Sequence, residues 1–315
     1  MELKPVRLVI TLGDPRGIGP EVAAAATRKL RPRTEASFTF VGPDNSPVRD
    51  VADSFIGVGN FAPSDVGSAG RAAGLAIIAA VEMVQSGAAD AIVTAPIDKA
   101  ALHAGGFQFP GHTEMLAHLA GGVPVVMMLA SEQTTLGGAL RVVLATTHLP
   151  LAGVPHALTS DLLVEQTRIT HDALRRGWRI ATPRIALCAF NPHASDGGLF
   201  GDEETRIYGP AIERLRHAGI RVSEPLPADT VFLRAGRGEF DVVIAPYHDV
   251  GMAAFKTAAF GHGVNVTLGL PFVRTSPDHG TAIDIAGTGA ADSSSMEEAI
   301  RLAIHLANDS IHSRL

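Results

Sequence analysis

The stretch DVVIAPYHD at residues 241–249 is a short apolar run that ends in a histidine, and two further stretches have the same layout, LRVVLATTH (140–148) and RIALCAFNPH (184–193). The apolar residues follow one another without polar alternation, which is typical of strands that are buried on both faces of a parallel sheet. The carboxyl ends of parallel strands share one edge of the sheet, and ligands bind there. We therefore predict that three histidines lie together at one edge: His148, His193 and His248.

Short apolar runs alternate with helix-length stretches along the whole chain. The predicted strands are Arg7–Leu12, Ser37–Val41, Ala91–Thr94, Val125–Leu129, Arg141–Ala145, Arg184–Ala189, Val242–Ala245 and Val264–Thr267. The predicted helices are Ala69–Gln85, Asp161–Arg176, Glu203–His217 and Ser295–Asn308. The second helix follows a Thr-Ser capping pair and stops at a glycine, as helices commonly do. This alternation predicts an α/β fold with largely parallel sheets that helices cover on both faces.

The composition is that of a globular protein with a substantial core, since 46% of the 315 residues are hydrophobic and 18% are charged. The formal net charge is -6 and the basic residues are scattered, so we expect neither nucleic acid nor a membrane as a partner. The single cysteine, Cys188, excludes an internal disulfide. We see no signal-peptide core and no uncharged apolar run of about 20 residues, which favours a cytoplasmic location.

The loop after the first predicted strand lacks the usual nucleotide-binding fingerprints. It reads GDPRGIGPE (13–21), which has neither the GxGxxG spacing nor the ending of a Walker A loop. A tight turn into a helix, with Pro20 in the first helical turn, is the alternative interpretation. A conventional Rossmann domain is therefore disfavoured, whereas a dehydrogenase is not.

The three strand-end histidines have the chemistry of a catalytic metal site. Neutral imidazole is a good ligand for zinc and other late divalent metals, and three protein ligands leave positions open for a substrate. The alternative for each histidine is a hydrogen-bonded residue in a turn. Two acidic residues, Asp249 and Asp229, are predicted to orient a metal-bound imidazole or to take part in proton transfer. For Asp229 the alternative is a helix cap.

A second group of residues suits a phosphate or a carboxylate. The sequence GHTE at residues 111–114 opens a predicted helix, where free backbone N–H groups and the helix dipole favour an anion. The candidate side chains are His112, Thr113, Lys256, Asn265 and Arg274. Arginine offers a planar fork for an oxyanion and lysine a point charge, although each could also be a surface charge.

The chain resembles the 4-hydroxythreonine-4-phosphate dehydrogenase family of vitamin B6 biosynthesis through motifs that follow in the same order from about residue 8 to residue 300. They are GDPRGIGPE, TAPIDKAAL, FPGHTEMLA, TTHLPL, NPHASDGGLFGDEE, PADT, PYHDVGMAAFK and VNVTLGLPFVRTSPDHGTAIDIAG. The set is highly specific, although no single motif is. One departure is Val250, where the family often has glutamine, and it lies beside the expected substrate site.

The resemblance implies a fold like that of isocitrate and isopropylmalate dehydrogenases, with two α/β domains and an active site in the cleft between them. The expected domains are residues 1–122 with 260–315 on the cofactor side, and residues 123–259 for metal, substrate and dimerisation. It also implies a homodimer whose metal site both subunits share, with His248 supplied in trans.

The resemblance assigns roles to individual residues as well. By this resemblance, His148, His193 and His248 are the ligands of a divalent metal (zinc, magnesium or cobalt). Substrate contacts fall on His112, Thr113, Lys256, Asn265 and Arg274. The segment His279–Gly287 looks like the adenosine-side cofactor loop, with the contacts His279, Gly280, Thr281, Ala282, Asp284 and Ile285. The general base stays open between Asp249, Asp229 and a metal-activated water, and the residues that we expect to act in catalysis are Asp249, Asp229 and Lys256.

The implied reaction is the metal-assisted oxidation of 4-phospho-hydroxy-L-threonine by NAD, with NADP as the alternative cofactor. Its product, 2-amino-3-oxo-4-phosphonooxybutanoate, loses carbon dioxide to give 3-amino-2-oxopropyl phosphate. The nearest rival keeps this chemistry and acts on D-threonate or D-erythronate 4-phosphate, and aromatic cis-dihydrodiols are a further substrate class among relatives. A metal-dependent hydrolase or aldolase without NAD is a rival of another class, and it would not need the loop DHGTAIDIAG (278–287).

Overall fold

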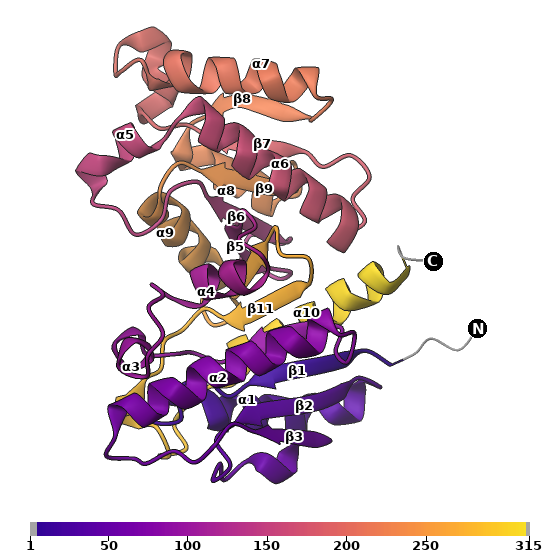
Figure 1. Cartoon of the computed structure of the whole chain (residues 1–315). Helices are drawn as coiled ribbons and strands as arrows, with labels where there is room; N and C mark the ends of the chain where they lie inside the picture. The colour runs from indigo at the N-terminus through magenta and orange to yellow at the C-terminus, as the bar shows by residue number, and fades with distance from the viewer. Residues whose placement is uncertain (1–4, 313–315) are drawn as a thin grey trace. The chain divides into compact units, whose positions relative to one another are not determined.

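The structure is a computed structural model that describes the backbone of residues 5–312 and the side chains up to residue 308. It contains two compact units (Figure 1), one formed by Met1–Pro124 with Val264–Leu315 and the other by Val125–Gly263. We call them unit 1 and unit 2. The predicted division placed the boundaries after residues 122 and 259, against 124 and 263 in the structure.

Unit 1 is built on a mostly parallel sheet. Its strands lie in the order β3 (Ser54–Gly57), β2 (Ser37–Gly42), β1 (Arg7–Thr11), β4 (Ala91–Thr94), β11 (Val273–Pro277) and β10 (Val264–Leu268). Neighbouring strands are parallel except for β10, which runs antiparallel to β11. The strands β1 (RLVIT) and β4 (AIVT) are mostly apolar and almost entirely buried, as the sequence predicted for strands covered on both faces.

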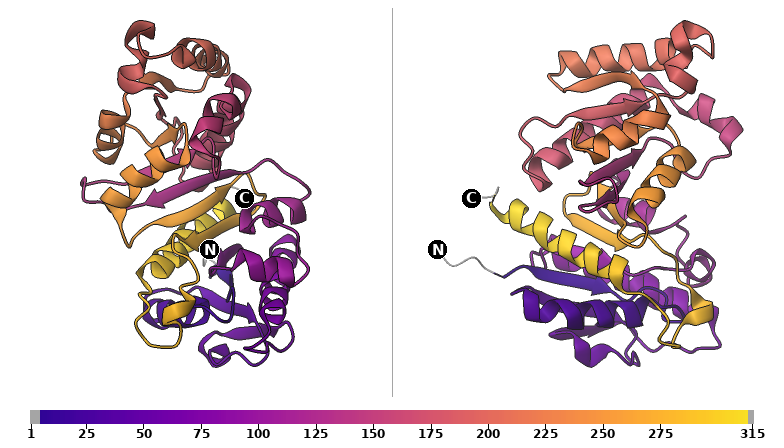
Figure 2. Two further views of the ribbon diagram at one scale, coloured as in Figure 1. Left: turned by 90° about the vertical axis from the view of Figure 1, so that its left-hand side faces the viewer. Right: turned by 180° about the vertical axis from the view of Figure 1, so that it is seen from behind.

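Helices cover both faces of this sheet. They are α1 (Gly19–Leu30), α2 (Val66–Gln85), α3 (Lys99–Ala104), α4 (His112–Leu119) and α10 (Ser294–His312). The helix α2 packs on β1, β2 and β4, whereas α10 packs on β4, β10 and β11 and also contacts α1. Figures 1 and 2 show α2 on one face and α10 on the other.

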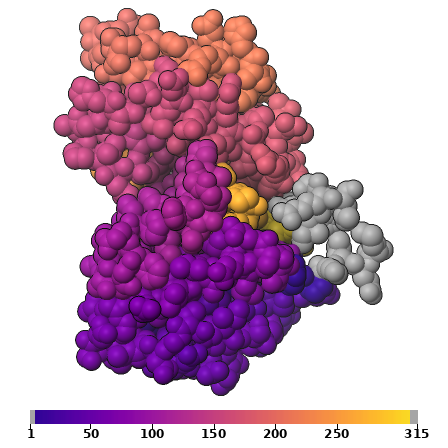
Figure 3. All heavy atoms as spheres, viewed as in Figure 1, coloured from indigo at the N-terminus to yellow at the C-terminus, as the bar shows by residue number. Residues whose placement is uncertain are grey.

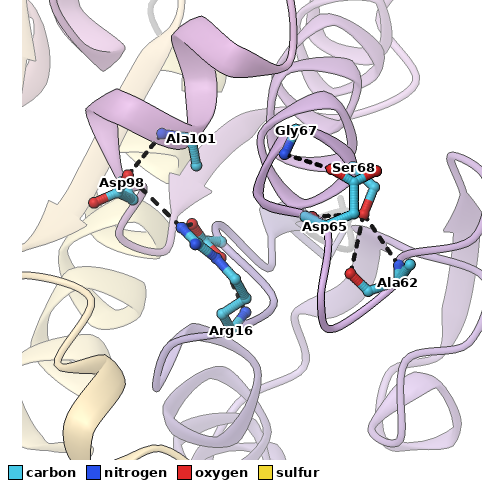
Figure 4. Close-up of polar contacts among 8 residues, drawn as sticks. Arg16, Ala62, Asp65, Gly67, Ser68, Asp98 and Ala101 are labelled. Carbon is cyan, nitrogen blue, oxygen red and sulfur yellow. Dashed lines mark hydrogen bonds and ion pairs between the residues drawn. The ribbon is translucent and has the colours of Figure 1, made fainter.

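The helix α2 is long and apolar enough to cross a membrane by length and composition. However, 50% of its most apolar 18-residue stretch is buried inside the protein. Small residues such as Ala73 and Ala80 are buried, and Arg71 and Glu82 are exposed on the outer side. That outer side belongs to the surface seen in Figure 3. The helix begins three residues earlier than predicted because Asp65 caps it, accepting a hydrogen bond of 2.9 Å from the Gly67 N–H (Figure 4). These features identify α2 as an amphipathic core helix.

The strands of unit 2 are also mostly parallel. The order is β5 (Val126–Ser131), β6 (Leu140–Leu144), β9 (Val242–Ala245), β7 (Ile185–Cys188) and β8 (Val222–Leu226). The strand β5 is antiparallel to β6, and the other described pairs of this unit are parallel. The helices are α5 (Val154–Ala157), α6 (Ser160–Gly177), α7 (Gly209–His217), α8 (Ala228–Gly236) and α9 (His248–Ala259). Buried residues of α8 and α9, among them Phe232 and Phe255, pack with β6, β7 and β9 to form the core.

The sequence prediction found most of the strands but missed three of them. The eight predicted strands are present, but β3, β8 and β11 were not predicted. Two of these carry prolines and polar residues (VSEPL and VRTSP), so they lack the apolar run on which the prediction relied. The predicted helix Glu203–His217 is present, but its first part, Glu204–Tyr208, is π-helical and continues directly into α7.

Candidate functional site

Three parallel strands of unit 2 bring the predicted histidines to one edge of its sheet. The strand β9 lies between β6 and β7 and is parallel to both, and each of the three strands is followed by one of these histidines. The prediction that the three residues follow strand ends at the same edge is therefore confirmed. A hydrogen bond of 2.8 Å from the Thr146 hydroxyl to the Pro246 carbonyl ties the loop after β6 to the loop after β9.

Two of the three histidines are close neighbours. The ring centroids of His148 and His248 are 5.5 Å apart. The Oδ1 atom of Asp249 lies 2.7 Å from Nδ1 of His248, which leaves Nε2 of that ring available for another partner. These residues line a pocket of about 180 Å³ in unit 2. Its complete lining is Thr146, Thr147, His148, Leu149, Leu151, Val154, Tyr247, His248 and Asp249.

The third histidine, His193, lies on an unusual turn after β7. Its φ is 51°, in the left-handed region, and the φ of His148 is also 51°. The ring of Phe190, three residues before His193, meets the ring of Tyr247 edge-on at 6.5 Å between centroids, so the loops after β7 and β9 touch. His193 does not line the pocket, and no group of three or more potential metal-binding side chains occurs among the residues that the structure describes. The three-histidine site thus remains a prediction.

The other predicted residues of unit 2 lie at or near the same edge. Asp229 is exposed in the first turn of α8, which follows β8; the helix cap is Pro227, so the capping alternative for Asp229 is wrong. Lys256 is half-buried on α9, two turns beyond His248. Asp249, in contrast, is exposed and bonded to the imidazole of His248, as expected for a residue that orients a ligand.

Unit 1 holds a buried cation to which no carboxylate is bonded among the described residues. The side chain of Arg274 is 2% exposed and donates hydrogen bonds only to hydroxyls, two to Thr94 (3.2 and 2.6 Å) and one to Thr267 (2.9 Å). Burial lowers the pKa of Arg274 to about 10, although the charge of Glu114 acts in the opposite direction. The guanidinium is therefore still charged at neutral pH, and the alternative that it is a surface charge is wrong.

Two of the predicted substrate contacts in this unit carry unsatisfied polar atoms. They are Nε2 of His112, the first residue of α4, and Oδ1 of Asn265, on β10. Thr113 follows His112 and is half-buried. Buried polar groups without partners are rare and costly, so their presence beside a buried arginine indicates that this region is completed by a ligand. The set is basic and donor-rich, which favours an anion.

We expect His112 to make the stability of the fold sensitive to acid. Burial, and second the charge of Arg274, hold the pKa of His112 well below its usual range. An unfolded histidine titrates near about pH 6.5, so the unfolded chain takes up the proton first as the pH falls. This contribution to stability is full above about pH 6.5 and is lost as the pH falls towards the lower, folded-state pKa.

The variant His112→Gln should therefore lose less stability than the wild type when the pH is lowered below about 6.5. The measurement is Tm against pH, with the exposed His217→Gln as the matched control. Parallel curves for His112→Gln and the wild type would contradict the expectation.

The predicted cofactor loop, residues 279–287, is hydrogen-bonded to the segment GDPRGIGPE (13–21), which lacks the usual nucleotide-binding fingerprints. The N–H of Ile18 donates to the Thr281 carbonyl at 2.9 Å, and the N–H of Gly287 donates to the Glu21 carboxylate at 3.2 Å. Ala282 lies in the left-handed region with φ 41°, and Nε2 of His279 is buried without a partner. The segment GDPRGIGPE is thus a support for the loop 279–287, a role that the sequence analysis did not find.

A network of ion pairs stabilises the segment GDPRGIGPE (Figure 4). The guanidinium of Arg16 bonds to the buried carboxylate of Asp14 at 2.7 Å and lies 3.7 Å from Asp98. Asp98 also caps α3 by accepting a hydrogen bond of 2.7 Å from the Ala101 N–H. The sequence contained a signal for this ion pair, because an Asp and an Arg two residues apart in a glycine-rich turn can bond to each other.

Replacing Gly17 with alanine should weaken cofactor binding by roughly 10- to 100-fold, because its Cβ would lie 2.5 Å from the Thr281 carbonyl oxygen. The loop 279–287 must then shift. The dissociation constant of NAD, the cofactor that the sequence resemblance implies, tests this result when it is measured by fluorescence titration. Gly153→Ala is the control, since no atom lies within 4 Å of its added Cβ, and an unchanged constant for Gly17→Ala would contradict the expectation.

The comparisons with known proteins agree on one family. The model of the pyridoxal phosphate biosynthetic protein PdxA matches residues 15–303. A relative from Paracoccus denitrificans, a 4-hydroxythreonine-4-phosphate dehydrogenase, is 47% identical over 97% of this chain and 98% of its own length. A crystal structure of the Klebsiella pneumoniae 4-hydroxythreonine-4-phosphate dehydrogenase covers 96% of this chain and 99% of its own at 36% identity, with a TM-score of 0.85.

The predicted fold class is confirmed as well. Isocitrate dehydrogenase from Methylococcus capsulatus aligns with a TM-score of 0.54 at 14% identity, covering 98% of this chain and 88% of its own, which shows a shared fold. Together with the family model, the buried arginine and the strand-end histidines, these likenesses identify the chain: it belongs to the PdxA family.

Proposed function

We propose that this chain oxidises 4-phospho-hydroxy-L-threonine with NAD in pyridoxal 5'-phosphate biosynthesis. The product, 2-amino-3-oxo-4-phosphonooxybutanoate, then decarboxylates to 3-amino-2-oxopropyl phosphate. The observation that carries the proposal is the buried guanidinium of Arg274, whose partners among the described residues are threonine hydroxyls and which lies in the same unit as an unsatisfied imidazole. A phosphorylated or carboxylated substrate supplies the missing anion.

The residues of unit 1 bind and orient the substrate. Arg274 presents a fork held in place by Thr94 and Thr267, so little side-chain entropy is lost when it binds an oxyanion. His112 is neutral at pH 7 because its pKa is low, and it donates a hydrogen bond without adding charge. With Thr113 and Asn265, this set distinguishes the phosphate and carboxylate ends and thereby orients the reacting C–H. The remaining proposed substrate contact is the half-buried Lys256 of unit 2.

We propose that the strand-end histidines of unit 2 hold a divalent cation. Imidazole nitrogens suit zinc and cobalt best, with magnesium as the harder alternative, and the pair His148 and His248 is already adjacent. The bond from Asp249 fixes the His248 ring so that its Nε2 is the atom available for the cation. His193 is the third ligand in this proposal. When bound, the cation would polarise the substrate hydroxyl as a Lewis acid.

The proton of that hydroxyl needs an acceptor in unit 2. Asp249 is already bonded to His248, so it orients the ligand and is the weaker candidate for the base. Asp229 is exposed at the carboxyl edge of the sheet and is the stronger candidate for the base. The ammonium of Lys256, two turns beyond His248, offers donors and no acceptor, so its proposed catalytic part is to orient the substrate.

We further infer NAD as the oxidant, bound by the loop 279–287 and its contacts His279, Gly280, Thr281, Ala282, Asp284 and Ile285. A cytoplasmic homodimer with a shared metal site completes the proposal. Apolar side chains are exposed on the loops that carry His148 and His193, and they suit a second copy of the chain: Leu149, Leu151, Leu199 and Phe200.

The test is NADH formation by purified, metal-supplemented enzyme with three substrates offered in parallel. They are 4-phospho-hydroxy-L-threonine, D-erythronate 4-phosphate and D-threonate 4-phosphate. A preference for the amino acid, abolished by a chelator and restored by metal, supports the proposal. A preference for a sugar acid would indicate that the enzyme acts in catabolism. Turnover without NAD would indicate a hydrolase or an aldolase.

A further inference from the structure

The turn that carries His193 has a backbone conformation that L-residues avoid. Six successive residues have positive φ: His193 (51°), Ala194 (55°), Ser195 (68°), Asp196 (43°), Gly197 (69°) and Gly198 (99°). Only the last two are glycines, and left-handed helical geometry costs other residues about 1–2 kcal/mol each. Such a run persists only where its surroundings impose it, and strain of this kind is concentrated at functional sites.

One carboxylate holds the start and the middle of this turn. Glu204 is 8% exposed, and its Oε1 accepts hydrogen bonds from the backbone N–H groups of Phe190 (2.9 Å) and Asn191 (2.8 Å). Its Oε2 accepts from the Asn191 side chain at 2.9 Å and from the Ser195 hydroxyl. The four donors lie on both sides of His193 in the sequence, so the carboxylate spans the histidine without bonding to it.

The segment that carries Glu204 is itself fixed on the end of β7. It is the π-helical turn Glu204–Tyr208, and the buried Tyr208 hydroxyl donates to the Cys188 carbonyl at 2.8 Å. No ion-pair partner of Glu204 occurs among the residues that the structure describes, so hydrogen bonds alone offset the burial of its charge. A buried carboxylate of this kind is expensive unless every acceptor position is used, which makes the contact specific.

We propose that Glu204 is a positioning residue that imposes the left-handed turn and so sets the direction of the His193 imidazole. This inference rests on the proposed function, in which His193 is a ligand of the divalent cation. Glu204 does not touch the cation or the substrate; it acts through the backbone of residues 190–195.

The test compares Glu204→Gln with Glu203→Gln. The amide of glutamine keeps an oxygen for the two backbone donors, but its NH₂ group faces the donating Asn191 side chain, so half of the contact is lost. Glu203 accepts one hydrogen bond from the same Asn191 side chain at 2.7 Å and lies 4.0 Å from the Arg206 guanidinium. It is the matched control because no backbone N–H of residues 190–195 donates to it among the described contacts. Ser195→Ala, which removes only one donor, serves where Glu204→Gln does not fold.

Two readouts are needed. The first is amide hydrogen exchange of residues 194–197 in the metal-free protein, which should become faster in Glu204→Gln and stay unchanged in Glu203→Gln. The second is the affinity for Co²⁺, titrated alone and followed by its visible absorption. We expect Glu204→Gln to lose roughly 10- to 100-fold in Co²⁺ affinity, the usual effect of removing support from a metal ligand.

The two readouts separate this inference from the proposed function. Where the wild type takes up no Co²⁺, the proposed metal role is wrong, and the exchange comparison alone decides the role of Glu204. Unchanged exchange in Glu204→Gln, or equal losses in both glutamine variants, would overturn the inference.

Discussion

Replacing His193 with alanine should lower kcat/KM for the phosphorylated substrate by roughly 1,000-fold, since Lewis-acid stabilisation is worth several kcal/mol. The change removes one of the three proposed ligands and leaves His148 and His248 in place, 5.5 Å apart. The imidazole of His193 is not part of the core of unit 2, so the fold should survive. Metal content, measured on the dialysed protein, should fall together with the activity.

Two variants serve as controls for this result. His193→Asn also lacks the imidazole, but asparagine tolerates the left-handed backbone at φ 51° better than alanine does. It should therefore match the activity of His193→Ala and keep a higher Tm. His217→Ala changes an exposed histidine of the same unit and should behave as the wild type. If His193→Ala kept its full metal content, the proposal of a three-histidine metal site would be wrong.

Replacing Arg274 with alanine should raise KM for the phosphorylated substrate by about 100-fold or more and change the affinity for NAD by less than about threefold. Its guanidinium is buried and bonded only to Thr94 and Thr267, so it has charge available for a ligand. A buried charge pair that loses one partner costs about 2–5 kcal/mol, which sets the size of the effect. Steady-state kinetics with each substrate varied in turn gives both values.

The lysine variant separates charge from geometry. Arg274→Lys retains the positive charge but not the fork that binds an oxyanion through two parallel hydrogen bonds, so it should recover only part of the loss. Equal losses of substrate and NAD affinity in Arg274→Ala would instead indicate a folding defect and contradict the assignment.

The agreement between sequence and structure is best where a single local pattern decides the outcome. The runs that became β6, β7 and β9 are four or five consecutive residues, mostly apolar, and all of their residues are buried. The cap of α6 is equally local: the Thr159 hydroxyl accepts a hydrogen bond of 3.1 Å from the Leu162 N–H. The weak strand β8 was missed because Pro225 and its neighbours give no such pattern, and its pairing with β7 shifts register there.

The amino-acid sequence was sufficient for the alternation of strands and helices and for the histidine at the end of each of three strands, because periodicity and capping act within a few residues. The three-dimensional arrangement was needed to place β9 between β6 and β7, which makes His148 and His248 neighbours. It was also needed to show that Arg274 is buried against Thr94, 180 residues away in the chain. Strand order and the burial of a charge depend on contacts between distant segments, and no local pattern encodes these contacts.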